Sequence, residues 1–181
     1  MPSILSRVLL ASTLSLASAI AAAGTVEPVL KFEGAIGVDP LTAAGGVDAL
    51  NVVRGVNPGG RAWVIRKLDA SVYADGSIVA RGKGLLLSSG EGIATRATIA
   101  QVVATLACGP ADATATKYTS EPGALDLAGN FSIRSLLRGG DGNIAPLATV
   151  PCANPQLLIR AFGASGPGGW FAAGILERDE D

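Results

Sequence analysis

The sequence predicts an all-β protein, an antiparallel sandwich or small barrel of about nine strands with one disulfide. Three observations lead to this prediction. First, 24 glycines and 10 prolines interrupt the 181 residues at short intervals. Second, the runs between them are short and rich in Val, Ile, Leu and Thr, which is typical of strands joined by tight turns. Third, these runs do not alternate with convincing helical segments, and two cysteines lie among them.

Residues 29–38, VLKFEGAIGV, predict the first strand because apolar and charged side chains alternate along them. On this pattern one face carries Leu30, Phe32, Ile36 and Val38, and the other carries Lys31 and Glu33. Residues 51–56, NVVRGV, predict a second, short strand that the turn sequence NPGG ends.

Residues 62–74 and 77–87 predict a β-hairpin joined through Asp75-Gly76. An Asp-Gly pair between two such runs indicates a type I′ turn, which requires positive φ at both central positions. Gly82 and Gly84 fall inside the second strand, where glycine indicates a bulge or a close approach of another backbone.

Residues 101–108, QVVATLAC, predict a strand with Val102, Ala104, Leu106 and Cys108 on one face. A helix over residues 96–107 fits as well, because apolar side chains also recur there at helical spacing and Gly109-Pro110 would end it. The β-branched content favours the strand, and both interpretations stay open at this point.

Four further strands are predicted in the C-terminal half, at residues 113–119, 130–137, 156–162 and 169–176. The stretch GASGPGG, residues 163–169, raises the question of a ligand-binding loop. It lacks the lysine and the Ser or Thr of a phosphate-binding loop, and no helix follows it. We interpret it as the turn that leads into the last strand.

Residues 1–23 are interpreted as a signal peptide: Arg7 precedes an apolar stretch, and small residues at 21–23 fit a cleavage site. A retained N-terminal anchor is the alternative. We expect a single β-rich domain over residues 24–176, followed by an acidic tail at 177–181. The chain is therefore expected to be secreted, or periplasmic in a Gram-negative host, with no membrane span in the mature protein.

Cys108 and Cys152 are expected to form one disulfide, since an even pair of cysteines in an exported chain indicates a bridge. Arg7 is lost with the leader, which leaves 13 basic residues against 15 acidic ones. These charges are scattered along the chain rather than gathered on a basic face, so we do not expect a nucleic-acid partner.

Several phrases, among them NVVRGVNPGGRAWVI, GKGLLLSSGEGIAT, VVATLACG and WFAAGI, resemble those of small exported proteins of uncharacterised function from bacteria and some fungi. The similarity extends over most of the expected mature chain and implies a single secreted β-rich domain. It brings no activity, ligand or catalytic residue with it.

The sequence contains no histidine, which excludes imidazole-based catalytic triads and histidine metal ligands. Bridged cysteines would exclude thiolate nucleophiles and cysteine zinc sites. No nucleophile elbow, P-loop or dinucleotide fingerprint is present. A pair of carboxylates working as in a glycosidase remains compatible with the sequence, although no pair stands out.

Three weak candidate sites remain, and no cofactor is expected. Asp141 and Asn143, in the glycine-rich stretch 138–146, offer oxygens for calcium, but a plain turn is favoured. Trp63 and Trp170 each follow a Gly/Pro turn and could stack on a sugar ring, but packing in the core is favoured for both. Asn130 begins a glycosylation sequon.

The leading hypothesis is a non-catalytic binding or surface-associated module with an unknown partner, for example a carbohydrate or a cell-surface component. A carboxylate-dependent glycan-active enzyme and a structural protein that self-associates through a sheet edge are the alternatives.

Overall fold

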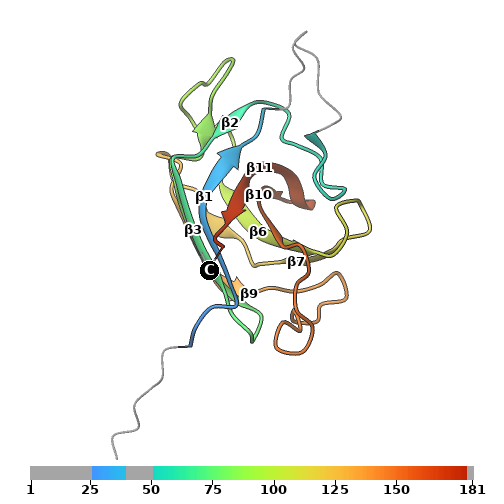
Figure 1. Cartoon of the computed structure of the whole chain (residues 1–181). Coiled ribbons are helices and arrows are strands. Elements are labelled where there is room, and N and C mark those ends of the chain that lie inside the picture. The colour runs from blue at the N-terminus through green and yellow to red at the C-terminus, as the bar shows by residue number, and fades with distance from the viewer. Residues whose placement is uncertain (1–25, 40–50, 179–181) are drawn as a thin grey trace, which may run out of the picture.

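The computed structural model describes residues 26–39 and 51–178. Within these residues every named element of secondary structure is a β-strand (Figure 1). The all-β prediction is therefore confirmed. Among these residues there is no helix that could cross a bilayer. The strands are β1 Leu30–Gly37, β2 Trp63–Val64, β3 Lys67–Val72, β4 Ser77–Lys83, β5 Leu86–Leu87, β6 Gln101–Cys108, β7 Thr116–Thr119, β8 Gly123–Ala124, β9 Phe131–Leu136, β10 Gln156–Gly163 and β11 Gly166–Leu176.

One antiparallel sheet of nine strands curls into a nearly closed barrel, which decides between the two predicted architectures. Its strand order is β7-β6-β10-β11-β1-β3-β4-β9, with β8 paired to β6, and β2 and β5 form a separate small pair. The two ends of the sheet meet where Thr119 and Arg138 exchange backbone hydrogen bonds of 2.8 and 3.0 Å. Figure 1 shows the strands wrapping around a common interior.

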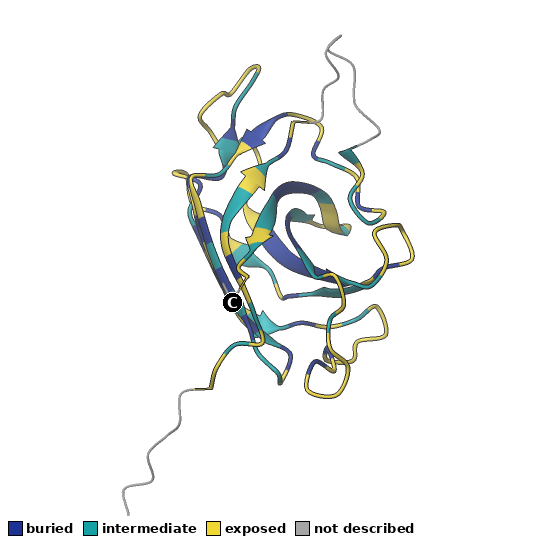
Figure 2. Cartoon of the chain, in the orientation of Figure 1, coloured by how far each residue is buried: buried dark blue, intermediate teal, exposed yellow. Residues whose placement is uncertain are grey.

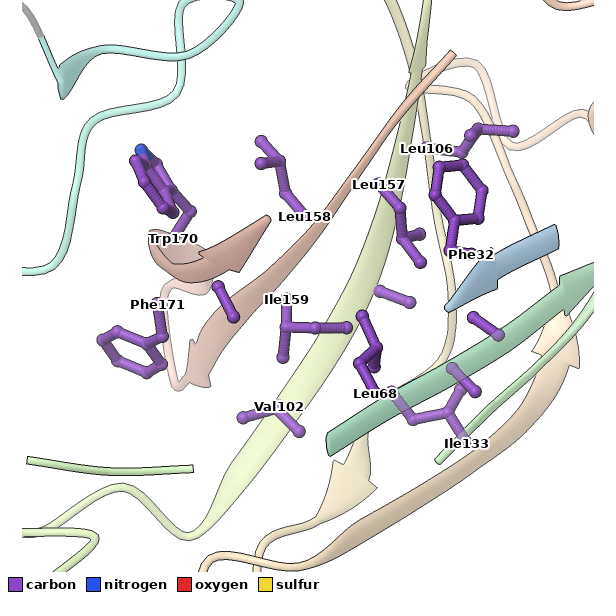
Figure 3. Packing of buried hydrophobic residues seen from close by; sticks show 14 of the residues in the cluster. Phe32, Leu68, Val102, Leu106, Ile133, Leu157, Leu158, Ile159, Trp170 and Phe171 are labelled. Carbon is purple, nitrogen blue, oxygen red and sulfur yellow. The ribbon is translucent and has the colours of Figure 1, made fainter. Parts of the chain in front are cut away.

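Large side chains fill the barrel interior, as in other small barrels. Phe32, Leu68, Ile78, Leu106 and Leu157 are all fully buried. Figure 2 shows buried stretches along the strands, and Figure 3 shows the side chains of Phe32, Leu68, Leu106 and Leu157. A second apolar layer lies outside the barrel against β10 and β11. Figure 3 shows Leu158 and Trp170 on one side of β10 and Leu157, Leu106 and Phe32 on the other. Consequently both faces of β6 and β10 are covered, and residues 102–107 and 157–159 are buried without alternation.

The predicted face of the first strand is wrong at one position. Phe32 and Val38 are buried, but Ile36 is 66% exposed. Gly34 has φ +77°, and the pairing of β1 with β11 shifts register between Phe32 and Ala35. This bulge adds one residue to β1, so the alternation reverses over residues 35–37. Val38 lies past the end of the strand and is not part of that alternation.

Residues 51–56 are a tight turn rather than the predicted strand. Val53 and Val56 exchange two backbone hydrogen bonds around Arg54 and Gly55, which both have positive φ. The predicted long strand at 62–74 is also interrupted. It divides into β2 and β3 at Ile65-Arg66.

The Asp75-Gly76 hairpin is confirmed, because β3 and β4 pair along their whole length. Its turn differs from the type I′ prediction, since only Gly76 has positive φ. This pattern matches a three-residue loop that ends on a left-handed glycine. The Asp75 carboxylate stabilises the turn by accepting hydrogen bonds from the amide and hydroxyl of Ser77.

Residues 101–108 form a strand, so the helical alternative for residues 96–107 is wrong. At Gly82 a side chain rather than the predicted second backbone approaches closely, because a Cβ there would lie 2.1 Å from the Phe131 ring. The last hairpin turns at Ala164-Ser165, so the glycines from Gly166 onward belong to β11 itself rather than to the turn.

The predicted disulfide between Cys108 and Cys152 is confirmed, with the two Cα atoms 4.9 Å apart. It joins the end of β6 to the segment that precedes β10. Arg54 ties the same end of the molecule to the turn at 53–56. Its guanidinium donates to the carbonyl oxygens of Gly109 and Asn154, each at 2.6 Å, and to that of Pro110.

Replacing both cysteines by alanine (Cys108→Ala with Cys152→Ala) is expected to lower the free energy of unfolding by about 4 kcal/mol. The bridge spans a sequence separation of 44, so its loss frees a long loop in the unfolded chain. Urea unfolding monitored by tryptophan fluorescence measures the change. The reduced wild type provides the control, and equal unfolding energies for variant and oxidised wild type would contradict the prediction.

Candidate functional site

Two glycine- and proline-rich segments far apart in the sequence lie side by side. Pro58 forms a parallel bridge with Trp170. The amide of Gly59 donates to the Trp170 carbonyl at 2.8 Å, and the Trp170 amide donates to the carbonyl of Asn57 at 3.0 Å. The segment at 57–59 thus extends the sheet along β11 beyond the point where β1 ends.

Glycine is required for this contact because the two backbones approach so closely. A Cβ on Gly59 would lie 2.7 Å from the ring of Phe171, and a Cβ on Gly169 would lie 2.7 Å from the Pro58 carbonyl oxygen. Real Cβ atoms do not come this near to other heavy atoms without a shift of the structure. Gly60, the next residue, has open space around its Cβ position.

The aromatic residues that follow the two segments are packed in the protein. Trp63 and Phe171 stack with their ring centroids 4.1 Å apart and are 4% exposed each. Trp170 is 6% exposed, and its indole N–H donates to the Asn51 carbonyl at 2.9 Å. Neither tryptophan therefore presents an open ring face of the kind that a stacking platform uses. Packing takes up both rings.

A surface groove of about 370 Å³ nevertheless lies over this meeting point. Its walls are the turn at 58–61, the loop at 97–99 and the part of the β10–β11 hairpin that carries Ala161 and Gly169. The Trp63–Phe171 pair also lines it. At the rim, the Arg61 guanidinium donates to the Glu91 carbonyl at 2.5 Å. This hydrogen bond connects the turn at 58–61 to the loop that follows β5. The groove is lined mainly by apolar side chains, by glycines and a proline, and by one cationic side chain.

The predicted calcium oxygens serve their own loop. One carboxylate oxygen of Asp141 accepts a hydrogen bond from the backbone amide of Asn143 at 3.0 Å. The other accepts one from the side-chain amide of Asn143 at 2.8 Å. In the part of the chain that the structure describes, no three acidic or cysteine side chains gather as metal ligands would. The arrangement is that of an Asx turn.

Asn130, the sequon residue, lies between two partners and is half-buried. Its side-chain amide donates to Asp126 at 3.0 Å, and its side-chain oxygen accepts from the Gly84 amide at 3.3 Å. A glycan attached to this side-chain nitrogen would replace one of its two hydrogens and would crowd the hydrogen bond to Asp126.

Four aspartates of the described chain have the same local role. Asp75, Asp112, Asp126 and Asp141 are exposed, and each accepts hydrogen bonds from residues two to four positions further along. These bonds lower the pKa of each carboxyl, mainly through Ser77, Thr114, Asn130 and Asn143 respectively. A general acid needs the opposite shift. Asp48 and the acids of 179–181 lie outside the described residues.

The sequence marks Trp63, Trp170 and both Gly/Pro segments, but it does not mark the loop at 97–99 or Ala161 as walls of the groove. No local signal marks these residues, because they join the groove only through the curl of the sheet. The repeated pattern of a Gly/Pro turn followed by an aromatic residue was the one available sign that the two segments meet.

Gly59→Ala is expected to lower the free energy of unfolding by about 1–3 kcal/mol, because its methyl group would overlap the Phe171 ring. Gly60→Ala is the matched control, since its Cβ would meet nothing within 4 Å and its φ is not positive. This control is expected to leave stability unchanged or to raise it by up to about 1 kcal/mol. Equal effects of the two substitutions in urea unfolding would contradict the close approach.

Acid is expected to destabilise the fold through the four turn aspartates. Their pKa values are lower in the folded protein than in the unfolded chain. Their contribution is therefore present above about pH 4 and is lost as the pH falls through the folded values. Asp126→Ala should reduce the loss of unfolding free energy between about pH 6 and about pH 2.5. Glu27→Ala, which removes an exposed carboxyl that accepts no hydrogen bond, serves as the control. An unchanged pH dependence in Asp126→Ala would refute this account.

The groove is thus assembled from three separate stretches of the described chain, at 58–63, 97–99 and 161–171. Comparison with known protein families, with curated proteins and with solved structures gives no match. What the groove can bind is therefore argued from its shape and its lining.

Proposed function

We propose that this chain is an exported, non-catalytic binding domain and that the groove at 58–61 and 97–99 is its ligand site. The observation that carries the proposal is the glycine-dependent meeting of Gly59 and Gly169 beside the Trp63–Phe171 pair. Because glycine has no side chain, the exposed Gly60 and the half-buried Gly169 leave room for a ligand beside this contact. The barrel interior is filled by side chains, so an outer groove is the better place for a ligand.

The lining favours a carbohydrate or another cell-surface component. Sugar rings combine apolar C–H faces with hydroxyl groups. The groove offers the partly exposed apolar side chains of Ala97, Ile99 and Ala161 to the first and the exposed Arg61 guanidinium to the second. Its volume of about 370 Å³ lies within the range of small-ligand sites, which is roughly 300–1,000 Å³.

Export is supported by the leader pattern at residues 1–23 and by the disulfide, since bridges of this kind persist in oxidising compartments. A non-catalytic role is supported by the absence of histidine from the sequence, the bridging of both cysteines, and the use of four aspartates as turn-stabilising groups.

A glycan array probed with the purified chain tests the proposal. We expect binding to a restricted set of glycans, and we expect Thr98→Trp to abolish it, because Thr98 is an exposed wall of the groove and a large ring there would fill the space. Ala148→Trp is the matched control, since Ala148 is exposed in a loop that does not line the groove. This variant should bind as the wild type does.

Two outcomes would overturn the proposal. The first is glycan binding that Thr98→Trp and Ala148→Trp leave equally intact. The second is turnover of a glycan, ester or peptide that a single Asp or Glu substitution abolishes, since that result would make the protein an enzyme.

A further inference from the structure

A second hollow, of about 470 Å³, lies on the outside of the barrel near the seam where the sheet closes. Strand β7 contributes Lys117 and Thr119, the segment after β9 contributes Arg138 with Gly139 and Gly140, and the β10–β11 hairpin contributes Pro167. We call this hollow the seam basin. It shares no lining residue with the groove at 58–61.

Arg160 lies next to the seam basin as a half-buried cation with neutral partners only. Its guanidinium donates to the carbonyls of Pro167 at 3.0 Å and Gly168 at 2.9 Å, and it contacts the Thr105 hydroxyl at 3.5 Å. That hydroxyl lies 3.0 Å from the hydroxyl of Thr119, which lines the basin. No described carboxylate forms an ion pair with Arg160.

Burial lowers the pKa of the Arg160 guanidinium below its ordinary value. A cation that has lost part of its hydration and has only neutral partners is stabilised by a nearby anion. The position of Arg160 therefore favours negative charge in the adjoining space.

The two cations that line the basin also use backbone carbonyls as partners. Lys117 donates to Ala113 at 3.1 Å and to Ala115 at 3.0 Å, and Arg138 donates to Gly142 at 2.9 Å. Two acids lie near these cations, and each is hydrogen-bonded within its own turn, although the charge of Lys117 also acts on Asp112. Asp112 accepts from Thr114, and Asp141, beside Gly139, accepts from Asn143. Each cation keeps donors that no described carboxylate occupies.

We propose that the seam basin binds an oxyanion group, a carboxylate or a sulfate, carried on a ligand about the size of a sugar residue. Lys117 and Arg138 would donate hydrogen bonds to the oxyanion directly. Arg160, which donates to the Pro167 carbonyl, would attract the oxyanion by its positive charge without contacting it. Charge-assisted hydrogen bonds of this kind are stronger than neutral ones. The volume of the basin exceeds what a single hydrated ion requires and falls in the range of small-ligand sites.

Isothermal titration of the purified chain with trigalacturonic acid tests the proposal at low ionic strength, with inorganic sulfate as a second probe and neutral galactotriose as the uncharged reference. We expect trigalacturonic acid to bind and galactotriose not to compete. Arg138→Gln combined with Lys117→Ala should weaken binding about tenfold, and added salt should weaken it further. Sulfate that binds as tightly as the trimer would identify a free oxyanion as the ligand, whereas tighter trimer binding would identify an acidic glycan.

The matched control is Arg134→Gln, which removes an exposed arginine of β9 that does not line the basin. It should leave binding unchanged, whereas the single variant Arg138→Gln, also at an exposed position, should weaken it even if the double variant folds poorly. The proposal is overturned if neither anion binds. It is equally overturned if Arg134→Gln and Arg138→Gln weaken binding to the same extent, because only the net charge would then matter.

Discussion

The backbone pairing of residues 57–59 with Trp170 is the contact on which the candidate site depends. It takes the place beside β11 at Trp170, next to where the pairing with β1 ends, and holds the turn at 58–61 against the sheet. Trp63 follows that turn, so the same pairing sets the position of its ring against Phe171. If the two backbones were even a methyl group farther apart, both the stacked pair and the groove above it would change shape.

This contact also explains two of the many glycines in the sequence, Gly59 and Gly169. The sequence GPGG at residues 166–169 is typical of a turn, yet these residues form the start of β11. Glycine is present at Gly169 because Pro58 occupies the space of its side chain, rather than because the chain reverses there. At Gly34 a positive φ adds a bulge instead, and the bulge helps the sheet to curl toward closure.

Local patterns were sufficient to predict the fold class, the disulfide and the Asp75-Gly76 hairpin, because alternation, cysteine parity and turn chemistry act over a few residues. Local patterns did not predict the structure where a bulge or a contact between distant segments determines it. Ile36 is exposed because of the bulge at Gly34, and the valines at 52–56 form a turn that Arg54 anchors to carbonyls about 55 to 100 residues away. Helix and strand could not be separated at 96–107, because both faces of β6 are buried and no alternation remains. The walls of the groove and of the seam basin carry no local signal, because only the curl of the sheet brings their segments together.

A filled barrel that is tied at one end leaves its outer surface as the place where specificity can arise. The disulfide and Arg54 fix the ends of β6 and β10, so the β10–β11 hairpin projects from a rigid base. Neighbouring residues of β10 face opposite ways, and Ala161 therefore lines the groove while Arg160 points toward the seam basin. One hairpin thus separates an aromatic, glycine-lined surface from a cationic one. Because both are held by the same strand pair, a ligand that carries sugar rings and acidic groups would meet two different chemistries on either side of it.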